Sequence, residues 1–257
     1  MYEKQLYGRK VLYFQYAPPM TKLDDCSDDA LDNRPNPPFR NAPLWQRSVY
    51  YYWWAFLREN RAYMATCDHG GVGEMAALYA DFGDVRDEDF MRWWRGGGRL
   101  LFCEPPHDEI EVFLSPPQTH DNESRVLLSI PVMGDINRTL AELKQLLKPV
   151  YKNASRNASG DSLARYPVET KAVLTSLHQH WLTWQAHKAN PTATLAELAD
   201  LAGIAAGGQG PIDDRAIRTS KAVKMGRYLS GARALIYNVG FGRFPDSTEP
   251  PADIIVV

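Results

Sequence analysis

The sequence predicts an α+β protein that is predominantly α-helical, with a small β-sheet in an N-terminal domain and a helical, helix-turn-helix-like C-terminal module. Apolar residues recur with the 3.6-residue period of a helix in six segments, whereas only three or four short runs are rich in β-branched and aromatic residues. A chain of 257 residues with 44% apolar and 23% charged side chains has the composition of an ordinary globular protein and can bury a sizeable core.

The first elements along the chain are a strand and a long aromatic helix. Residues 9–16 are β-branched and aromatic and lie between Gly8 and Pro18, which predicts a strand. Six prolines in residues 17–43 predict an irregular, acidic connection. Residues 43–65 then predict one helix, opened by a proline in its first turn. Because this segment is apolar on nearly all sides, we expect the helix to be buried on two faces.

The middle of the chain mixes short helices and short strands. Phenylalanine and tryptophan at spacings of three and four favour a helix before the glycine run 96–98, which ends it. The strands expected beyond that point are apolar runs separated by polar, proline-containing loops. The segments predicted here are, in order, helices at 74–81 and 87–95, strands at 99–103, 110–114 and 125–132, and a helix at 135–148.

The polar segment 149–162 is the best candidate for a domain boundary, because it is poor in apolar residues and contains a short Asn-Ala-Ser repeat. We therefore expect an aromatic-rich α+β domain at 1–150, a basic helical module at 163–244 and an acidic, proline-containing tail at 245–257. Within the basic module, helical periodicity predicts three helices, at 167–188, 194–202 and 213–238.

Charge is distributed unevenly along the chain. The whole chain has a formal net charge of -2, yet residues 163–244 contain ten basic and five acidic side chains. A positive module on a mildly acidic body is typical of a protein that binds a polyanion. The short, alanine-rich helix at 194–202 followed by a long helix is typical of a helix-turn-helix unit, although the connection 205–214 is longer than the usual turn.

The long helix at 213–238 contains the candidate nucleic-acid contacts. Cations recur at every third residue, so that they spiral around the helix and could contact several phosphates of duplex DNA. The alternative is an ordinary solvated helix face. Two small hydroxyl residues among the cations could reach a phosphate or a base edge, or could equally have no role in binding. The predicted contact residues are Arg215, Arg218, Thr219, Ser220, Lys221, Lys224 and Arg227.

Other kinds of chemistry have little support, and we predict no catalytic residue, no metal site and no cofactor. Cys67 and His69 lack the paired spacing of zinc ligands, and the Gly-rich run 70–73 lacks the residues that complete a phosphate-binding loop. Glu109 and Glu111 share one face of a predicted strand, as in metal-dependent nucleases, but no lysine falls within the predicted strands.

The cysteine count and the hydropathy predict a cytoplasmic protein without a membrane partner. Three cysteines without a Cys-x-x-Cys pair favour a reducing compartment, and no apolar run is long enough to cross a bilayer. The aromatic residues at 50–54 and Trp93 and Trp94 fall on the faces expected to be buried, which favours core packing over base stacking or peptide recognition.

Four segments of the chain resemble segments of uncharacterised bacterial proteins that prophages and integrative elements carry. They are SVYYYWWAFLREN, LYADFGDVRDEDFMRWW, RLLFCEP and RYLSGARALIYNVGFGRFP. The resemblance covers residues 45–105 and 190–245, and it implies a mobile-element context without an activity or a site residue to transfer. Together with the basic helix, it leads us to expect a DNA-binding accessory protein of a mobile genetic element. The alternative is a non-catalytic adaptor, complex subunit or inhibitor of a host system, which would bind a protein partner through the aromatic-rich N-terminal domain and the acidic loop 24–32.

Overall fold

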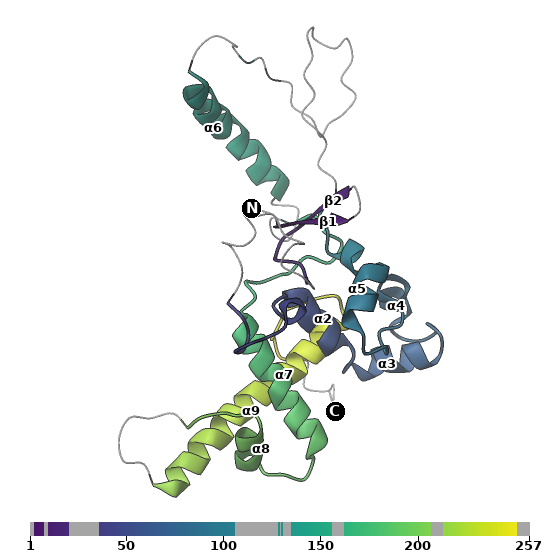
Figure 1. The fold of residues 1–257 in the computed structure, drawn as a ribbon, viewed down its shortest axis with the longest axis vertical. Helices are drawn as coiled ribbons and strands as arrows, with labels where there is room; N and C mark the ends of the chain where they lie inside the picture. The colour runs from purple at the N-terminus through teal and green to yellow at the C-terminus, as the bar shows by residue number, and fades with distance from the viewer. Residues whose placement is uncertain are drawn as a thin grey trace. The chain divides into compact units, whose positions relative to one another are not determined.

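The computed structural model is predominantly α-helical, with eight α-helices in the residues that it describes (Figure 1). Those residues are 3–7, 10–20, 36–105, 128, 130, 135–155, 162–206 and 213–250. Contacts group the chain into two compact units, one formed by residues 1–105 and 163–257 and the other by residues 106–162. Among the described residues, no helix combines the length and the apolar character that crossing a membrane requires.

The β-structure of the described residues is smaller than the sequence predicts. Strands β1 (Glu3–Tyr7) and β2 (Lys10–Phe14) form an antiparallel hairpin, in which Glu3 pairs with Phe14. The predicted strand at 9–16 is therefore confirmed as β2, and β1 is an additional strand. Phe14 also forms an isolated antiparallel bridge with Cys103. The predicted strand at 110–114 lies outside the described residues, and so does the strand at 125–132 except for residues 128 and 130.

The strand predicted at 99–103 is wrong, because most of this segment is the 3-10 helix η3 (Gly98–Leu101). The amide of Leu100 donates to the Gly97 carbonyl at 2.9 Å, and the amide of Phe102 donates to the Arg99 carbonyl at 3.2 Å. These bonds close tight turns directly after the preceding helix. A short apolar run does not by itself distinguish a strand from a buried turn of helix.

The helix predicted at 43–65 is divided into three pieces. They are the 3-10 helix η2 (Leu44–Gln46), α2 (Val49–Leu57) and α3 (Arg61–Asp68). The interruption has a local cause, because the Asn60 side chain accepts a hydrogen bond from the amide of Tyr63 at 3.0 Å and so starts a new helix. Every residue of α2 is buried, which confirms the expected burial on more than one face.

The remaining helices follow the predicted order. The first of them, α4, is followed by α5, whose N-terminal cap is Asp89, which accepts from the Arg92 amide at 2.9 Å. Helix α7 begins later than predicted, because Val168 forms a parallel bridge with Phe244 and the chain is not yet helical there. Their bounds are α4 (Ala76–Phe82), α5 (Phe90–Gly96), α6 (Ile136–Ser155), α7 (Leu174–Ala189), α8 (Leu195–Leu201) and α9 (Asp214–Val239).

The main core joins the two ends of the sequence. Trp53 of α2 is fully buried, and its ring centroid lies 5.0 Å from that of Phe102 and 5.4 Å from that of Phe244. Phe56 packs edge-on against Trp181 of α7 at 5.6 Å. Because the helices before residue 105 and those after residue 163 share this core, the units seen in the contacts differ from the domains expected at 1–150, 163–244 and 245–257.

Candidate nucleic-acid interface

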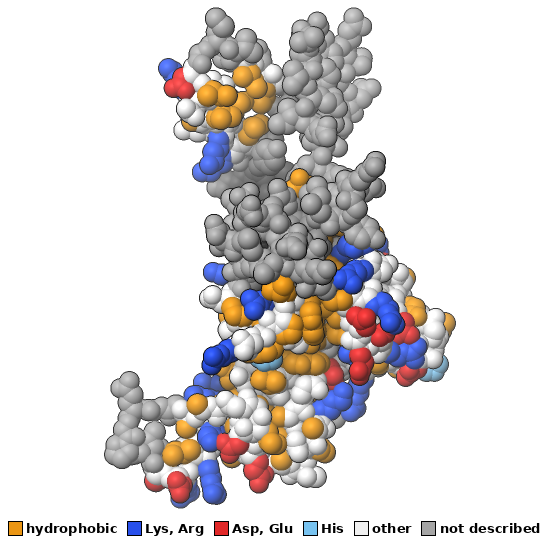
Figure 2. Space-filling model, in the orientation of Figure 1, with side chains coloured by type: hydrophobic (Ala, Val, Ile, Leu, Met, Phe, Trp, Pro, Cys, Tyr) orange, Lys and Arg blue, Asp and Glu red, His pale blue; other side chains and the backbone are white. Residues whose placement is uncertain are grey.

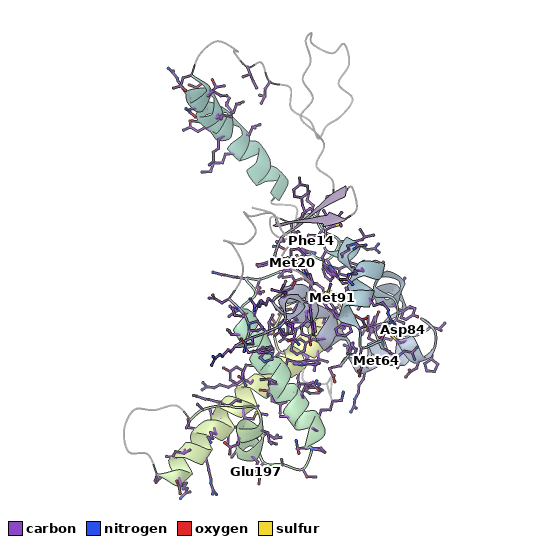
Figure 3. All side chains as sticks on the ribbon, viewed as in Figure 1. Phe14, Met20, Met64, Asp84, Met91 and Glu197 are labelled. Atoms are coloured by element: carbon purple, nitrogen blue, oxygen red, sulfur yellow. The ribbon has the colours of Figure 1, made fainter. Side chains whose placement is uncertain are left out.

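Helix α8 is short and strongly fixed at its N-terminus. Thr194 and Glu197 form a capping box, in which the Thr194 hydroxyl oxygen accepts from the Glu197 amide and the Glu197 carboxylate accepts from the Thr194 amide at 2.8 Å. These bonds from Thr194, together with the nearby charge of Arg218, hold the pKa of the Glu197 carboxyl below its usual value. Glu197 is labelled in Figure 3, at the start of α8.

A second, small core packs α8 against α9. Leu198, Ala199 and Ala202 lie with Ile204 against Met225 of α9, and all five residues are buried. Helix α9 starts at Asp213, whose carboxylate accepts from the Ala216 amide at 2.6 Å. A short helix held against the first half of a longer one is the central feature of a helix-turn-helix unit. In Figure 1, α7 crosses α9 and α8 lies beside the N-terminal half of α9.

Two of the five predicted contact cations are engaged within the protein. The ammonium group of Lys221 forms an ion pair with Asp200 of α8. The ammonium group of Lys224 donates to the Ala205 carbonyl at 3.0 Å, just after α8 ends. Both lysines are half-buried. They therefore hold α8 and the following loop on α9, and they are poorly placed to contact a ligand.

The other three cations, Arg215, Arg218 and Arg227, are exposed. Among the described residues, no side-chain hydrogen bond or ion pair is seen for these three guanidinium groups, although the charge of Arg218 lies near the Glu197 carboxylate. Arg215 and Arg218 lie in the first two turns of α9, and Arg227 lies about two and a half turns beyond Arg218 on a different side. The predicted spiral is thus present in the helix, but only its first two arginines share one exposed side.

The hydroxyl residues between the cations differ in exposure. Thr219 is exposed, and its hydroxyl donates to the Arg215 carbonyl at 2.9 Å, whereas Ser220 is half-buried. Acidic side chains lie close to this region, since Asp213 caps α9, Asp214 is its first residue and Asp200 is in the last turn of α8. Figure 2 shows red and blue side chains side by side at this end of the molecule. The exposed contact surface is therefore small and contains Arg215, Arg218 and Thr219.

The crossing of α7 and α9 contains a groove that sequence reasoning missed. It is an open hollow of about 570 Å³, and the residues lining it include His180, Arg227, Ser230, Gly231 and Glu249. The Ser230 hydroxyl donates to the Glu249 carboxylate at 3.4 Å. His180 bonds through Nδ1 to the Ser176 carbonyl at 2.7 Å, and burial lowers the pKa of its ring. Only the fold brings these residues together, because they are up to 69 positions apart in the sequence.

Gly231 allows α7 and α9 to approach closely at this crossing. A Cβ atom at position 231 would overlap Nε2 of His180. We expect Gly231→Ala to lower the free energy of unfolding by about 1–2 kcal/mol, because overpacking costs more than a helical glycine-to-alanine change gains. Urea unfolding of the full chain measures this change.

Gly226 of the same helix provides the matched control. The nearest atom to a Cβ at position 226 is 3.9 Å away, on Leu195. Gly226→Ala should therefore raise the free energy of unfolding by about 0.5–1 kcal/mol, as expected for removing glycine from a helix. If both variants were stabilised equally, the close contact between Gly231 and His180 would not matter for stability.

The other residues that the sequence suggests as candidates for catalysis, phosphate binding or metal binding lie elsewhere in the chain. Cys67 is buried, and burial raises the pKa of its thiol, which makes it a poor nucleophile. The glycine run 70–73 forms the turn between α3 and α4. The described residues contain no group of three or more His, Cys, Asp or Glu side chains that could hold a metal ion. Glu109 and Glu111 lie outside the described residues.

The predicted aromatic cluster belongs to the core. All five aromatic residues at positions 50–54 are buried, and so is Trp94, whereas Trp93 is half-buried and packs against the same core. The buried aromatic residues therefore cannot stack on bases or anchor a protein partner at the surface without unfolding α2.

Comparison of the chain with protein-family models, with curated proteins and with solved structures finds no match in any of the three.

Proposed function

We propose that the chain binds duplex DNA through the α8–α9 unit, as an accessory protein of a mobile genetic element. The observation that carries this proposal is that some cations of α9 are engaged in contacts within the protein and others are exposed. Lys221 and Lys224 hold α8 and its following loop, while Arg215 and Arg218 stay exposed at the start of α9. Helix-turn-helix proteins commonly contact DNA through the first turns of the second helix of the unit.

Arg215, Arg218 and Thr219 have the chemistry that this position requires. A guanidinium group binds a phosphate with two parallel hydrogen bonds, and a small hydroxyl residue can contact a phosphate or a base edge. Arg215 and Arg218 are one turn apart, about 4.5 Å along the helix axis. We therefore expect both arginines to contact the backbone of one groove wall, with Thr219 nearest the bases. Arg227 lies on a different side and is not in this contact set.

Binding of this kind depends strongly on salt. Each phosphate that the protein neutralises releases condensed counterions and adds about 0.9 to the slope of log affinity against log salt concentration. The double variant Arg215→Ala/Arg218→Ala should lower that slope by about 2 and weaken binding by about tenfold for each contact. The measurement is a fluorescence-anisotropy titration of the full chain on duplex DNA at several salt concentrations.

A control with the same loss of charge separates specific contacts from the general effect of net charge. Arg61 and Arg92 are exposed and lie in α3 and α5. Arg61→Ala/Arg92→Ala should leave both the slope and the affinity nearly unchanged. If both double variants lost the same affinity and the same salt slope, the effect would come from net charge and not from specific contacts. Absence of binding at low salt would reject the proposal and favour the adaptor alternative.

A further inference from the structure

The open groove at the crossing of α7 and α9 has a positive and a negative side chain in its wall (Figure 1). They are Arg227 of α9 and Glu249 of the tail, and both are exposed. No ion pair is seen for either of them among the described residues, so the two charges line the same hollow without neutralising each other. A hollow of about 570 Å³ has the size of a small-molecule site.

His180 adds a neutral hydrogen-bond acceptor to this groove. Its Nδ1 lies 2.7 Å from the Ser176 carbonyl oxygen, so that Nδ1 carries the proton and Nε2 is the acceptor. Burial lowers the pKa of the ring, which keeps it uncharged at neutral pH. The ring packs edge-on against Tyr228, with 5.3 Å between the centroids, and Nε2 lies beside Gly231. These contacts fix the position of the acceptor.

The tail segment that contains Glu249 is fixed against α9. The buried side chain of Asn238 donates through Nδ2 to the carbonyls of Asp246 and Thr248, each at 3.0 Å. The Ser230 hydroxyl donates to the Glu249 carboxylate at 3.4 Å. Both sides of the groove are therefore held by contacts within the protein, and a ligand does not have to order them on binding.

The two acceptors lie at one level of α9, and the cation lies at another. Ser230 bonds to Glu249, and the next residue, Gly231, adjoins Nε2 of His180. Arg227 is three residues before Ser230, which places it about 4.5 Å away along the helix axis and on the same side of the helix. The groove thus offers two acceptors at one end and a guanidinium donor at the other.

These charges determine which class of ligand fits. A simple anion would be repelled by the Glu249 carboxylate, and a simple cation would be repelled by Arg227. A ligand with both charges satisfies both groups, because its carboxylate accepts from the guanidinium while its ammonium group donates to Glu249 and to Nε2 of His180. Val223, which is 50% exposed, gives the same hollow an apolar wall.

We propose that this groove binds a free α-amino acid with an apolar side chain. Arg227 contacts the carboxylate of the ligand, Glu249 and His180 contact its ammonium group, and Val223 contacts its side chain. Arg227 is not among the residues through which we propose DNA binding, so the two proposals are independent of each other.

Isothermal titration calorimetry of the full chain, without DNA, tests the class of ligand. The probes are L-leucine and two analogues, of which leucinamide lacks the carboxylate and isocaproate lacks the ammonium group. L-Leucine should bind at least about tenfold more tightly than either analogue, because each analogue leaves one charge of the groove unpaired. Absence of L-leucine binding at millimolar concentration would overturn the proposal, and so would an analogue that binds as tightly as L-leucine.

Two variants assign the contacts, and each is matched to one analogue. Arg227→Gln should weaken L-leucine binding about tenfold or more but leave leucinamide binding unchanged, because leucinamide has no carboxylate. Glu249→Gln should weaken L-leucine binding similarly but leave isocaproate binding at least as tight, because the repelling carboxylate is gone. Arg218→Gln removes the same charge from the exposed start of α9 and should change none of these affinities. Equal effects of Arg227→Gln and Arg218→Gln on L-leucine binding would contradict the assignment of this groove.

Discussion

Replacing Trp53 with alanine is expected to lower the free energy of unfolding by about 3–5 kcal/mol. Trp53 is fully buried, and its ring contacts Phe82, Phe102 and Phe244, which come from both ends of the sequence. A cavity at this point cannot be filled easily, because its walls are the aromatic rings of several elements. Urea unfolding followed by circular dichroism measures the loss.

The same variant tests how the chain divides into domains. Because α2 packs against α7 and against Phe244, Trp53→Ala should shift the unfolding of both segments of unit 1 together. Trp45, which is half-buried in η2, provides a matched control, and Trp45→Ala should cost less than half as much. If residues 163–244 instead unfolded in a separate transition that Trp53→Ala leaves unchanged, they would form an independent domain, as the sequence predicts.

Most helices of this chain can be predicted from the sequence, because their apolar periodicity and their caps are local. Asp213 caps α9 and Thr194 caps α8, and both are residue types that favour helix N-termini. Helix boundaries that depend on contacts between residues distant in the sequence are harder to predict. Nothing in the periodicity of 43–65 shows that Asn60 ends one helix and starts another. Pairing of Val168 with Phe244, which delays α7, joins residues 76 positions apart.

The candidate site shows the same limit. The sequence identifies the cations of α9 correctly as residues of one long helix. It does not show which of them form hydrogen bonds or ion pairs within the protein. Lys221 reaches Asp200, and Lys224 reaches the Ala205 carbonyl, only because α8 folds back on α9. The groove beside His180 depends in the same way on the crossing of α7 and α9 and on the tail residue Glu249.

Asn60→Ala is expected to lower the free energy of unfolding by about 2–4 kcal/mol, because one side chain makes two buried hydrogen bonds. Its oxygen accepts from the Tyr63 amide at 3.0 Å and caps α3, which contributes about 1 kcal/mol. Its Nδ2 donates to the Ile236 carbonyl at 2.8 Å, near the end of α9. Leaving that buried carbonyl unpaired costs about 1–3 kcal/mol. Gly240 permits the approach, since a Cβ there would lie 2.6 Å from Nδ2 of Asn60.

Asn60→Ser separates these two contributions. Serine caps a helix about as well as asparagine, but its short side chain cannot reach Ile236. We therefore expect Asn60→Ser to retain the cap, to lose the bond to α9, and to be about 1 kcal/mol more stable than Asn60→Ala in urea unfolding. Equal stability of the serine variant and the unchanged protein would mean that the bond between Asn60 and Ile236 does not help to hold α9 against the α2–α3 corner. Equal stability of the serine and alanine variants would mean that the cap at position 60 does not contribute to stability. The break between α2 and α3 would then need another cause.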